Sequence, residues 1–246
     1  HVRSRRQRQM CIRDSSKTIA DDYRNWLRDS GISTAPAFDI AYFHLGADLN
    51  NSAPTKGMPA DAPQTLAKLS ARPSFLMVGT LEPRKGYRHI VDAFTRLWLG
   101  GEDVNLVIVG KVGWNIEGLV RTLQSHQELG KRLIWLQGVS DEYLERIYAD
   151  STVLIAASEG EGFGLPIIEA AQHGLPVILR DIPVFREVAG EAGFYFPGNT
   201  PEDTAECLKA WLQLYQVGTH PKSTSLSYQS WEQSVQQIRT ALALPQ

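Results

Sequence analysis

The sequence contains little cysteine, with only Cys11 and Cys207 among its 246 residues. Two cysteines are too few for a disulfide framework, and they lack the Cys-x-x-Cys spacing that is typical of zinc sites. We therefore expect a reducing, cytoplasmic setting.

The sequence also lacks any apolar run that approaches the roughly 20 residues needed to span a bilayer as a helix. Its apolar runs are short, such as residues 152–157. Hydrophobic residues make up 43% and charged residues 21%, which is ordinary for a globular protein and excludes a largely disordered chain. We expect a folded protein that meets a membrane only peripherally.

The net charge of −2 conceals an uneven distribution. Residues 1–15 contain five of the 25 basic residues and one of the 27 acidic residues, so 20 basic and 26 acidic residues remain after position 15. Clustered arginines suit the phosphates of nucleic acids. However, residues 5–15 resemble the translation of a transposon-end adapter used in sequencing. We therefore expect residues 1–15 to be a sequencing-adapter artefact, and we expect no nucleic-acid partner.

The remaining sequence is predicted to begin with a helix over 17–28, capped by Ser16, and a strand over 37–43. Residues 49–72 are rich in Pro, Ala, Asn and Ser and lack a long periodic apolar pattern, which predicts a linker. From Ser74 onward, short apolar runs alternate with amphipathic stretches. This alternation predicts an α/β fold, a doubly wound parallel sheet of the Rossmann-like type.

The predicted strands of this sheet are residues 75–78, 105–109, 133–136, 153–156, 176–179 and 193–195. The predicted helices are residues 87–99, 116–128, 141–148, 166–173, 184–188, 202–215 and 228–242. In such sheets ligands bind beyond the carboxyl ends of the strands, so the loops that follow the strands are the candidate sites.

The first candidate loop, residues 79–86, follows the predicted strand 75–78. Gly79 allows a ligand to approach the backbone closely, and Arg84 and Lys85 place two cations where a diphosphate could bind without a metal. A basic pair at the start of a surface helix is also commonly just solvated. This loop alone therefore leaves both interpretations open.

The second candidate loop follows the predicted strand 153–156 and contains glycines at positions 160, 162 and 164. Pro166 suits the first turn of a helix, so the backbone N–H groups of residues 162–165 are expected to be unpaired and to form an anion site. Glu161 in the loop and Glu169 in the helix would flank the same opening at the carboxyl ends of the strands, which we call the mouth. Carboxylates there can accept hydrogen bonds from sugar or ribose hydroxyls. An acid near the start of a helix, such as Glu169, also has an ordinary role in stabilising the helix dipole.

Two further glycines follow strands. Gly110 follows the predicted strand 105–109 and Gly138 follows 133–136, where each would border a nucleotide. Glycines also commonly end strands for structural reasons, so both interpretations stay open. The histidines show no metal-ligand spacing and no Asp-x-Asp occurs, and we therefore expect neither a metal site nor a cofactor.

Together these loops resemble the retaining glycosyltransferases of family four, over residues 72–215. Residues 161–169, Glu-Gly-Phe-Gly-Leu-Pro-Ile-Ile-Glu, are similar to the E-x7-E signature of that family. Residues 78–86, Val-Gly-Thr-Leu-Glu-Pro-Arg-Lys-Gly, resemble its first phosphate loop, and a branch of O-antigen mannosyltransferases shares the Glu-Pro-Arg-Lys form. Many members have an arginine where this sequence has Thr80.

The resemblance implies the GT-B fold, in which two Rossmann-like domains face each other across a cleft, and this chain would hold the carboxyl-terminal half. It implies that Arg84 and Lys85 bind the donor diphosphate and act with Glu161 in catalysis. Glu161 would hold donor-sugar hydroxyls and Glu169 the ribose. The further donor-binding residues would be Gly79, Thr80, Gly110, Gly138, Gly162, Phe163, Gly164 and Leu165.

The resemblance further implies transfer of a hexose such as mannose, with retention of configuration, from a nucleotide-diphosphate sugar to a saccharide or lipid-linked acceptor. This would take place in the cytoplasm, at the inner face of the cell membrane. Residues 16–48 would be a remnant of the amino-terminal acceptor domain, 73–225 the donor-binding domain and 226–246 a carboxyl-terminal helix. We expect such a truncated chain to be inactive by itself. A non-catalytic nucleotide-sugar-binding module is the alternative that the residues leave open.

Overall fold

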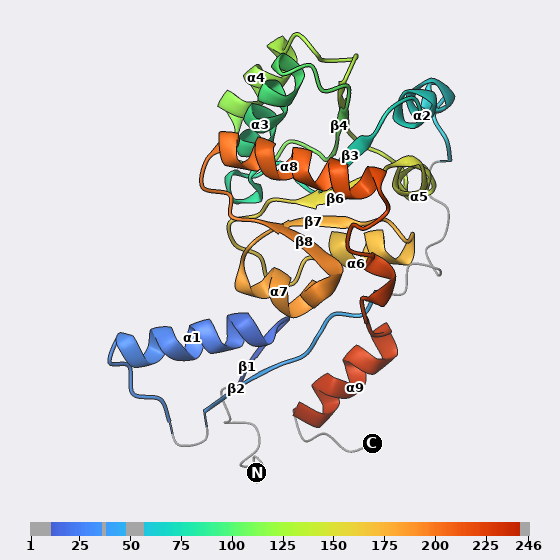
Figure 1. Ribbon diagram of the computed structural model, residues 1–246. Helices are drawn as coiled ribbons and strands as arrows, with labels where there is room; N and C mark the ends of the chain where they lie inside the picture. The colour runs from blue at the N-terminus through green and yellow to red at the C-terminus, as the bar shows by residue number, and fades with distance from the viewer. Residues whose placement is uncertain (1–10, 36–37, 48–56, 242–246) are drawn as a thin grey trace.

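The computed structural model describes residues 11–35, 38–47 and 57–241. Figure 1 shows two parts: a larger part in which helices cover both faces of a sheet, and a smaller part below it that contains the beginning and the end of the described chain. Residues 1–10 of the expected adapter segment lie outside the described residues, as do residues 49–56 of the expected linker.

The larger part is built on six strands, which are mostly apolar: β3 (Ser74–Val78), β4 (Asn105–Val109), β5 (Leu133–Leu136), β6 (Val153–Ala156), β7 (Val177–Arg180) and β8 (Gly193–Phe196). All neighbouring strands are parallel, in the order β5-β4-β3-β6-β7-β8. This is the strand order of the Rossmann fold, so the predicted doubly wound parallel sheet is confirmed. The direction of winding reverses between β3 and β6, which is where such sheets bind ligands.

Helices alternate with these strands. They are α2 (Ala62–Ser70), α3 (Tyr87–Leu99), α4 (Glu117–Ser125), α5 (Asp141–Asp150), α6 (Leu165–Gln172), α7 (Pro183–Ala189) and α8 (Pro201–Gln216), with short 3₁₀ turns η3 (Pro83–Lys85), η4 (Gly190–Ala192) and η5 (Ser223–Ser225). The Ser140 hydroxyl accepts a hydrogen bond from Tyr143 N at 3.2 Å, and so caps α5 as the sequence predicts.

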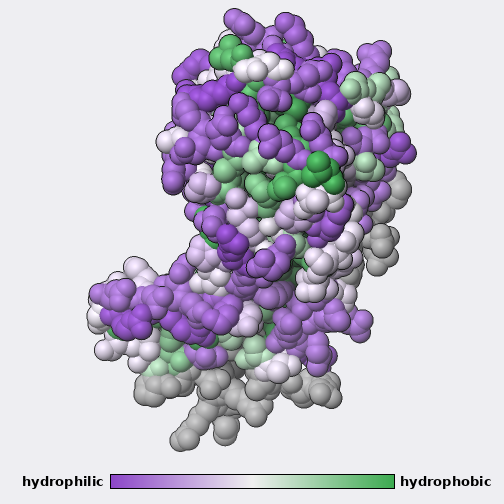
Figure 2. Space-filling model, in the orientation of Figure 1, coloured by the Kyte–Doolittle hydropathy of each residue, from purple (hydrophilic) through white to green (hydrophobic). Residues whose placement is uncertain are grey.

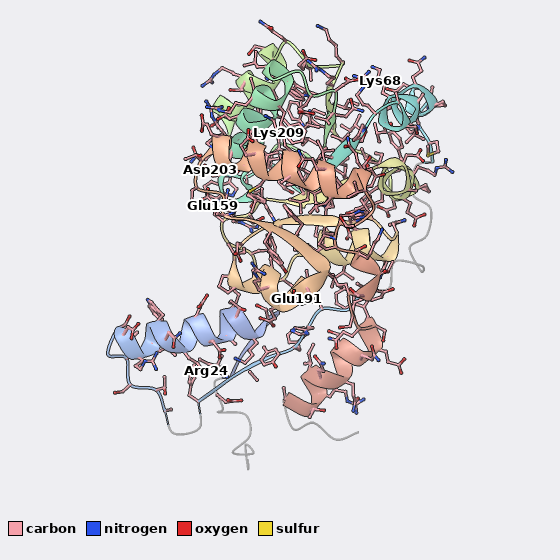
Figure 3. The ribbon with its side chains drawn as sticks, in the orientation of Figure 1. Arg24, Lys68, Glu159, Glu191, Asp203 and Lys209 are labelled. Atoms are coloured by element: carbon pink, nitrogen blue, oxygen red, sulfur yellow. The ribbon has the colours of Figure 1, made fainter. Side chains whose placement is uncertain are left out.

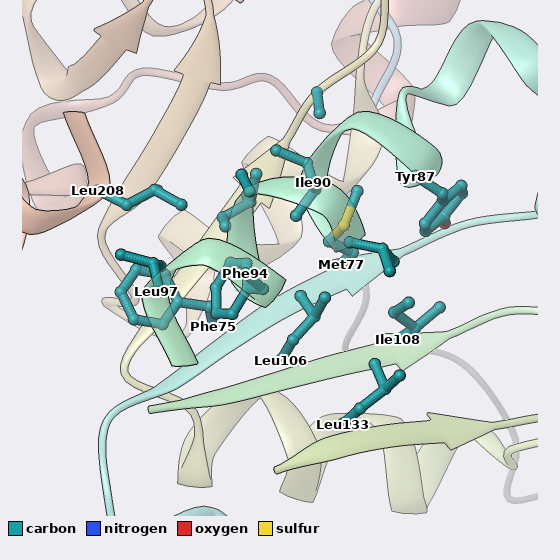
Figure 4. Close-up of a cluster of buried hydrophobic side chains, with 14 of the residues drawn as sticks. Phe75, Met77, Tyr87, Ile90, Phe94, Leu97, Leu106, Ile108, Leu133 and Leu208 are labelled. Atoms are coloured by element: carbon teal, nitrogen blue, oxygen red, sulfur yellow. The ribbon is translucent and has the colours of Figure 1, made fainter. Parts of the chain in front are cut away.

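Each face of the sheet is covered by a separate hydrophobic core. Alternate residues of β3 enter opposite cores, as the strand period of two requires. Phe75 and Met77 enter the core beneath α3, α4 and α8, where the rings of Phe75 and Phe94 lie 5.3 Å apart edge to face (Figure 4). Leu76 enters the core beneath α2, α5, α6 and α7. Because both faces are covered, the central strands are apolar at nearly every position.

Two helix boundaries differ from the prediction by three residues. The predicted helix 116–128 ends at Ser125, because His126 has an extended backbone conformation with φ −69° and ψ 131°. The last helix, α9 (Trp231–Ala241), begins later than the predicted position 228. The reason is a β-bridge that pairs Gln229 with Gly46, a residue far away in the sequence.

Part of the expected linker is a helix. The helix α2 occupies residues 62–70 of the stretch 49–72, with a proline in its first turn. Ala62 and Leu69 are buried, and α2 packs against α5. The Ala- and Pro-rich composition suggested a linker, but these two residues are buried in the same hydrophobic core as Leu76 of β3. The interpretation of residues 62–70 as a linker is therefore corrected to a packed helix.

The smaller part combines segments from both ends of the described chain. The strands β1 (Cys11–Asp14) and β2 (Asp39–Tyr42) pair in parallel, α1 (Lys17–Asp29) connects them, and α9 lies against β2. The backbone of residues 11–14, which belong to the expected adapter segment, thus forms a strand. Arg24 projects from α1 towards β2, where its guanidinium donates to Ile40 O (Figure 3). Figure 2 shows mainly hydrophilic residues on the visible side of α1.

The Glu187 carboxylate of α7 joins the two parts. It accepts hydrogen bonds from Lys17 N and Thr18 N, both at 2.8 Å, and so caps the amino-terminal end of α1. The Thr18 hydroxyl donates to the same carboxylate at 2.6 Å, and the His44 ring lies 2.8 Å from it. Burial raises the pKa of Glu187, but these hydrogen bonds lower it more, so its pKa lies below the usual value.

Candidate functional site

The loops that follow β3 and β6 meet where the winding of the sheet reverses. Glu159 N donates a hydrogen bond of 2.8 Å to Arg84 O, which joins the two loops directly. Gly86 has a φ of +69°, and a Cβ at this position would lie 2.3 Å from Ala157 O. Only glycine therefore lets the turn η3 approach the end of β6 so closely. This contact brings the two predicted candidate loops together.

Three charged residues of these loops form one cluster. Glu161 bonds Lys85, and its carboxylate also lies 3.4 Å from Arg84 Nη1. The Ser158 hydroxyl donates to Glu161 Oε2 at 3.2 Å. Burial raises the pKa of Glu161, but the hydrogen bond from Lys85 and the positive charges of Lys85 and Arg84 lower it further. Its pKa lies below the usual value, so Glu161 is a carboxylate at neutral pH.

Arg84 is the more exposed of the two cations. Its side chain is 46% exposed, whereas that of Lys85 is 20% exposed. Arg84 also donates to Gly160 O at 3.1 Å and pairs with Glu82 at 3.1 Å. Arg84, which the sequence predicts to bind phosphate, is therefore positioned by backbone and carboxylate oxygens and remains accessible to solvent.

The first loop is held by its glycines and by Tyr87. The Tyr87 hydroxyl, at the start of α3, donates to Gly79 O at 2.7 Å. A Cβ on Gly110 would lie 1.9 Å from the same Gly79 O, and Leu81 N donates to Lys111 O at 2.9 Å. Gly110 is thus explained by the close approach of the loops after β3 and β4. Thr80 is half-buried, and its Cγ2 would lie 2.9 Å from a Cβ on Gly113.

The amino-terminal end of α6 opens at the same mouth. Gly164 has a φ of +98° and immediately precedes the helix, whose first turn contains Pro166. Within the described part of the chain, the N–H groups of Phe163, Gly164 and Leu165 have no hydrogen-bond acceptor. The prediction of free N–H groups over 162–165 is wrong at one position, because Gly162 N donates to Glu161 Oε1 at 3.3 Å. Three N–H groups and the positive end of the helix dipole remain available for an anion.

Glu169 does not join the charged cluster. It lies one turn into α6, where its Oε2 accepts a hydrogen bond of 2.6 Å from the Tyr148 hydroxyl of α5. Burial raises the pKa of Glu169, although the hydrogen bond from Tyr148 acts in the opposite direction. The two carboxylates of the E-x7-E pattern therefore have different partners: Glu161 contacts the two cations, and Glu169 contacts α5.

The remaining predicted residues lie apart from the charged cluster. The Phe163 side chain is buried, and its ring lies 5.3 Å from that of His44. Leu165 is half-buried at the start of α6. Gly138 follows β5 in an exposed position with a φ of +65°, and a Cβ there would meet no atom within 4 Å. The structure thus brings the first and second loops together but gives Gly138 no neighbour in them.

Sequence reasoning missed Arg180, a buried cation at the same edge of the sheet. Arg180 ends β7 with only 8% of its surface exposed. It donates to Ala157 O and to Gly198 O, both at 2.9 Å, and pairs with no carboxylate in the described part of the chain. Burial lowers its pKa. A basic residue directly after a predicted strand was the available signal. Sequence reasoning also missed three hydroxyl groups that contact the site, because their partners are distant in sequence or lie in a loop. These belong to Tyr87, Tyr148 and Ser158.

Two cavities lie near the mouth. One of about 30 Å³ lies beneath the loops and is bordered by Lys85, Tyr87, Ser158 and Glu161. Another of about 870 Å³ lies beside Phe163, between α6, α7, the segment after β2 and α9. Its polar lining comes largely from amide and aromatic side chains, which are Tyr42, His44, Tyr228, Gln229, Gln233, Gln236 and Gln237.

Metal ligands do not cluster in the part of the chain that the structure describes, where no three His, Cys, Asp or Glu residues could hold an ion. Over the same ranges, no helix is both long and apolar enough to cross a bilayer.

Comparison with known sequences identifies the family. The family described as "Glycosyl transferases group 1" matches residues 61–229. The serotype-specific mannosyltransferase WbdA of Escherichia coli is 48% identical over 231 residues, which are 93% of this chain and 28% of that protein. The O-antigen chain mannosyltransferase B of E. coli is 30% identical over 176 residues, 69% of this chain and 45% of that protein. The chain thus spans about a quarter to a half of the length of these relatives.

Solved structures support the fold. The chain is similar to Anabaena Alr3699/HepE, solved in complex with UDP and glucose, with a TM-score of 0.70 and 19% sequence identity. The similarity covers 95% of this chain and 62% of that one. Sucrose-phosphate synthase from Thermosynechococcus elongatus gives a TM-score of 0.68 at 24% identity, over 94% of this chain and 57% of that one. The expected relation to the GT-B fold is confirmed by these neighbours. Since the family match covers more than half of the sequence, the chain belongs to the glycosyl transferases of group 1.

Proposed function

We propose that the chain is the donor-binding part of a retaining glycosyltransferase, which transfers mannose from a nucleotide-diphosphate sugar. The observation that carries the proposal is the cluster at the reversal point of the sheet. There Arg84 and Lys85, held by Glu161, lie on a loop that is bonded to the loop leading into α6. Cations and helix N–H groups at one mouth suit a diphosphate.

The diphosphate would bind between the cations and the start of α6. When the bond to the sugar breaks, negative charge grows on the departing diphosphate. Groups that are already oriented towards that charge stabilise it at little cost of rearrangement. Arg84, Lys85 and the N–H groups of residues 163–165 would supply this stabilisation. No metal ion is needed for this role, because the protein itself supplies the positive charge.

The sugar and the ribose would be held by the two carboxylates. Glu161, ionised by its cationic neighbours, would accept hydrogen bonds from hydroxyls of the donor sugar. Glu169 would accept hydrogen bonds from the ribose. Backbone groups would make further donor contacts, at Gly79, Thr80, Gly110, Gly138, Gly162, Phe163, Gly164 and Leu165. Phe163 would act only through its backbone, since its side chain is buried.

Mannose is supported by the relatives, since both E. coli proteins compared above are named as mannosyltransferases. From the resemblance to O-antigen mannosyltransferases we further propose a saccharide or lipid-linked acceptor at the inner face of the cell membrane. Residues 16–48 would complete an acceptor domain, and residues 73–225 would form the donor domain. The helix α9 contacts β2, which supports the proposal that residues 226–246 pack against the acceptor domain.

The proposal is tested by calorimetric titration of the chain with UDP, GDP and ADP and their hexose conjugates, without added metal. We expect saturable binding of one nucleotide series. Arg84→Ala should weaken the binding of the diphosphate at least about tenfold, which corresponds to one charge-assisted contact. The matched control is Arg88→Ala, which removes an exposed arginine at the second position of α3 and should change affinity less than about twofold. Absence of binding by the folded chain, or equal effects of both variants, would contradict the proposal.

A further inference from the structure

We propose that Tyr148 is a positioning residue for the nucleotide ribose, because its hydroxyl holds Glu169 Oε2 and leaves Oε1 for the ribose diol. The inference rests on the proposed function and deepens it by adding a residue that acts through Glu169. Tyr148 lies on α5, outside both candidate loops, and no pattern in the sequence connects it with residue 169. The two residues meet only because α5 and α6 pack on the same face of the sheet.

The hydrogen bond from Tyr148 makes the two oxygens of the Glu169 carboxylate unequal. Oε2 accepts from the Tyr148 hydroxyl at 2.6 Å, a short distance that is typical of a hydroxyl bonded to a carboxylate. Oε1 has no donor in the described part of the chain. It is also absent from the buried atoms that lack a partner, so it is not fully buried. A carboxylate held in this way presents one free oxygen in a defined direction.

Packing holds the tyrosine ring in place. Tyr148 is 2% exposed, so its ring is enclosed by the core. The ring stacks on His173, with centroids 5.2 Å apart and planes 4° from parallel. His173 caps the carboxyl-terminal end of α6, one turn after Glu169. The tyrosine therefore contacts the helix of Glu169 at two points, and its hydroxyl cannot turn away without disturbing the core.

The protonation states of the two groups agree with Tyr148 as the hydrogen-bond donor and Glu169 as the acceptor. Burial raises the pKa of Tyr148 well above its usual value, so the phenol keeps its proton and donates. Burial also raises the pKa of Glu169, while the hydrogen bond from Tyr148 favours the ionised form. His173 acts in the same direction as Tyr148, and Asp141 opposes them. Removal of the phenol would leave Oε2 without a donor and make the carboxylate harder to ionise, which weakens both possible hydrogen bonds to the diol.

A merely structural role for Tyr148 gives a different expectation. If the hydroxyl only satisfies a buried oxygen, its loss destabilises the protein and affects all nucleotides alike. If it positions the carboxylate, its loss affects only ligands that carry the ribose hydroxyls. The nucleoside diphosphate that the chain binds, among UDP, GDP and ADP, is compared with its 2′,3′-dideoxy form. This comparison separates the two roles, because the dideoxy compound keeps the base and the diphosphate.

The experiment uses Tyr148→Phe, which keeps the ring and its stacking. We expect the wild-type chain to bind the ribonucleotide at least about tenfold more tightly than the dideoxy form, as two hydrogen bonds to a charged group would give. In Tyr148→Phe this preference should fall at least about fivefold, while affinity for the dideoxy form changes less than about twofold. Tyr143→Phe is the matched control. Tyr143 is buried on the same helix, and no hydrogen bond joins its hydroxyl to Glu169 in the described residues, so the preference should persist.

A second variant guards against a change in folding. Glu169→Gln should lose the same preference for the ribonucleotide over its dideoxy form. The double variant Tyr148→Phe/Glu169→Gln should lose no more of this preference than either single variant, since both substitutions act on one interaction. An unchanged preference in Tyr148→Phe would overturn the inference while the proposed function stands. Wild-type binding without any preference for the ribonucleotide would overturn the role of Glu169 and the inference together. Failure of the folded wild-type chain to bind UDP, GDP or ADP would overturn the proposed function itself.

Discussion

At the scale of single residues, Glu161 is the group on which the charged cluster depends. Its carboxylate contacts Lys85 and Arg84, and it receives the Ser158 hydroxyl. Its side chain is only 14% exposed, so water competes weakly for these contacts. Two cations in one mouth repel each other, and the carboxylate offsets that repulsion until an anion binds.

Glu161→Gln should lower the free energy of unfolding by about 1–3 kcal/mol at pH 7, because the two cations lose their carboxylate. The pKa of Glu161 in the folded state lies below its unfolded value. Its contribution is therefore fully present above the unfolded pKa and is lost as the pH falls through the folded pKa. Urea unfolding of both proteins at a series of pH values should show the difference shrinking below about pH 4.3. A difference that is independent of pH would contradict this account.

Gly110→Ala should destabilise the protein by about 3 kcal/mol, because the new methyl group would collide with backbone rather than with a movable side chain. The added Cβ would lie 1.9 Å from Gly79 O. Gly160→Ala is the control, since a Cβ at that position meets no atom within 4 Å. The control should change stability by less than about 0.5 kcal/mol. The urea midpoints of the two variants provide the measurement, and equal midpoints would show that the loops move apart freely.

At the scale of elements, the attachment of α1 depends on a residue of another helix. Ser16 caps α1, as the sequence predicts, by accepting from Ile19 N at 3.3 Å. The first N–H groups of α1 are satisfied instead by Glu187 of α7. A helix of 13 residues is marginal by itself in water, so this tertiary contact is expected to decide its local stability.

Glu187→Ala should therefore loosen α1 while the six-stranded sheet stays intact. Loss of two or three hydrogen bonds lowers the free energy of local opening by about 1–3 kcal/mol, which predicts cleavage about tenfold faster or more. The helix offers tryptic sites at Lys17, Arg24 and Arg28, so limited trypsin digestion followed by mass spectrometry measures the effect. Glu191→Ala, at the nearby position labelled in Figure 3, is the control and should cleave at the wild-type rate. Unchanged cleavage in Glu187→Ala would mean that other contacts hold α1.

At the scale of the whole molecule, the two parts have cores of very different size. Two extensive clusters cover the faces of the six-stranded sheet. The buried centre of the smaller part consists of Ala20, Leu27 and Ile40, with Tyr23 and Phe38 beside them. Apolar burial is the main source of stability, so the smaller part should open more easily than the sheet.

Native-state hydrogen exchange should show this difference directly. Amides of β3 and β6 are expected to exchange only through global unfolding, because these strands lie at the centre of the sheet. Amides of α1 and β2 should exchange with a free energy several kcal/mol smaller, on the order expected for sub-global opening. Exchange measured at increasing urea concentrations would separate the two groups. A single shared free energy would instead show that the smaller part unfolds together with the sheet.

The sequence by itself determined the local features of this protein. Its short apolar runs predicted the strands of the sheet, Ser140 predicted a helix start, and Pro166 with its preceding glycines predicted the opening of α6. These features depend on neighbouring residues, through side-chain alternation, capping and backbone freedom. The positions of the candidate loops at strand ends follow from the same patterns, since a parallel sheet places all carboxyl ends at one edge.

Only the tertiary structure decided which of these features meet. The contact of Lys85 with Glu161 spans 76 residues of sequence, and it exists because β3 and β6 are neighbours in the sheet. Tyr148 reaches Glu169 because α5 and α6 share a face, and α2 is a helix because its two buried residues find a core there. Local patterns do not specify these pairings. They arise because parallel strands can only be joined by long crossovers, so strand order is set by packing of the whole chain and not by adjacency in sequence.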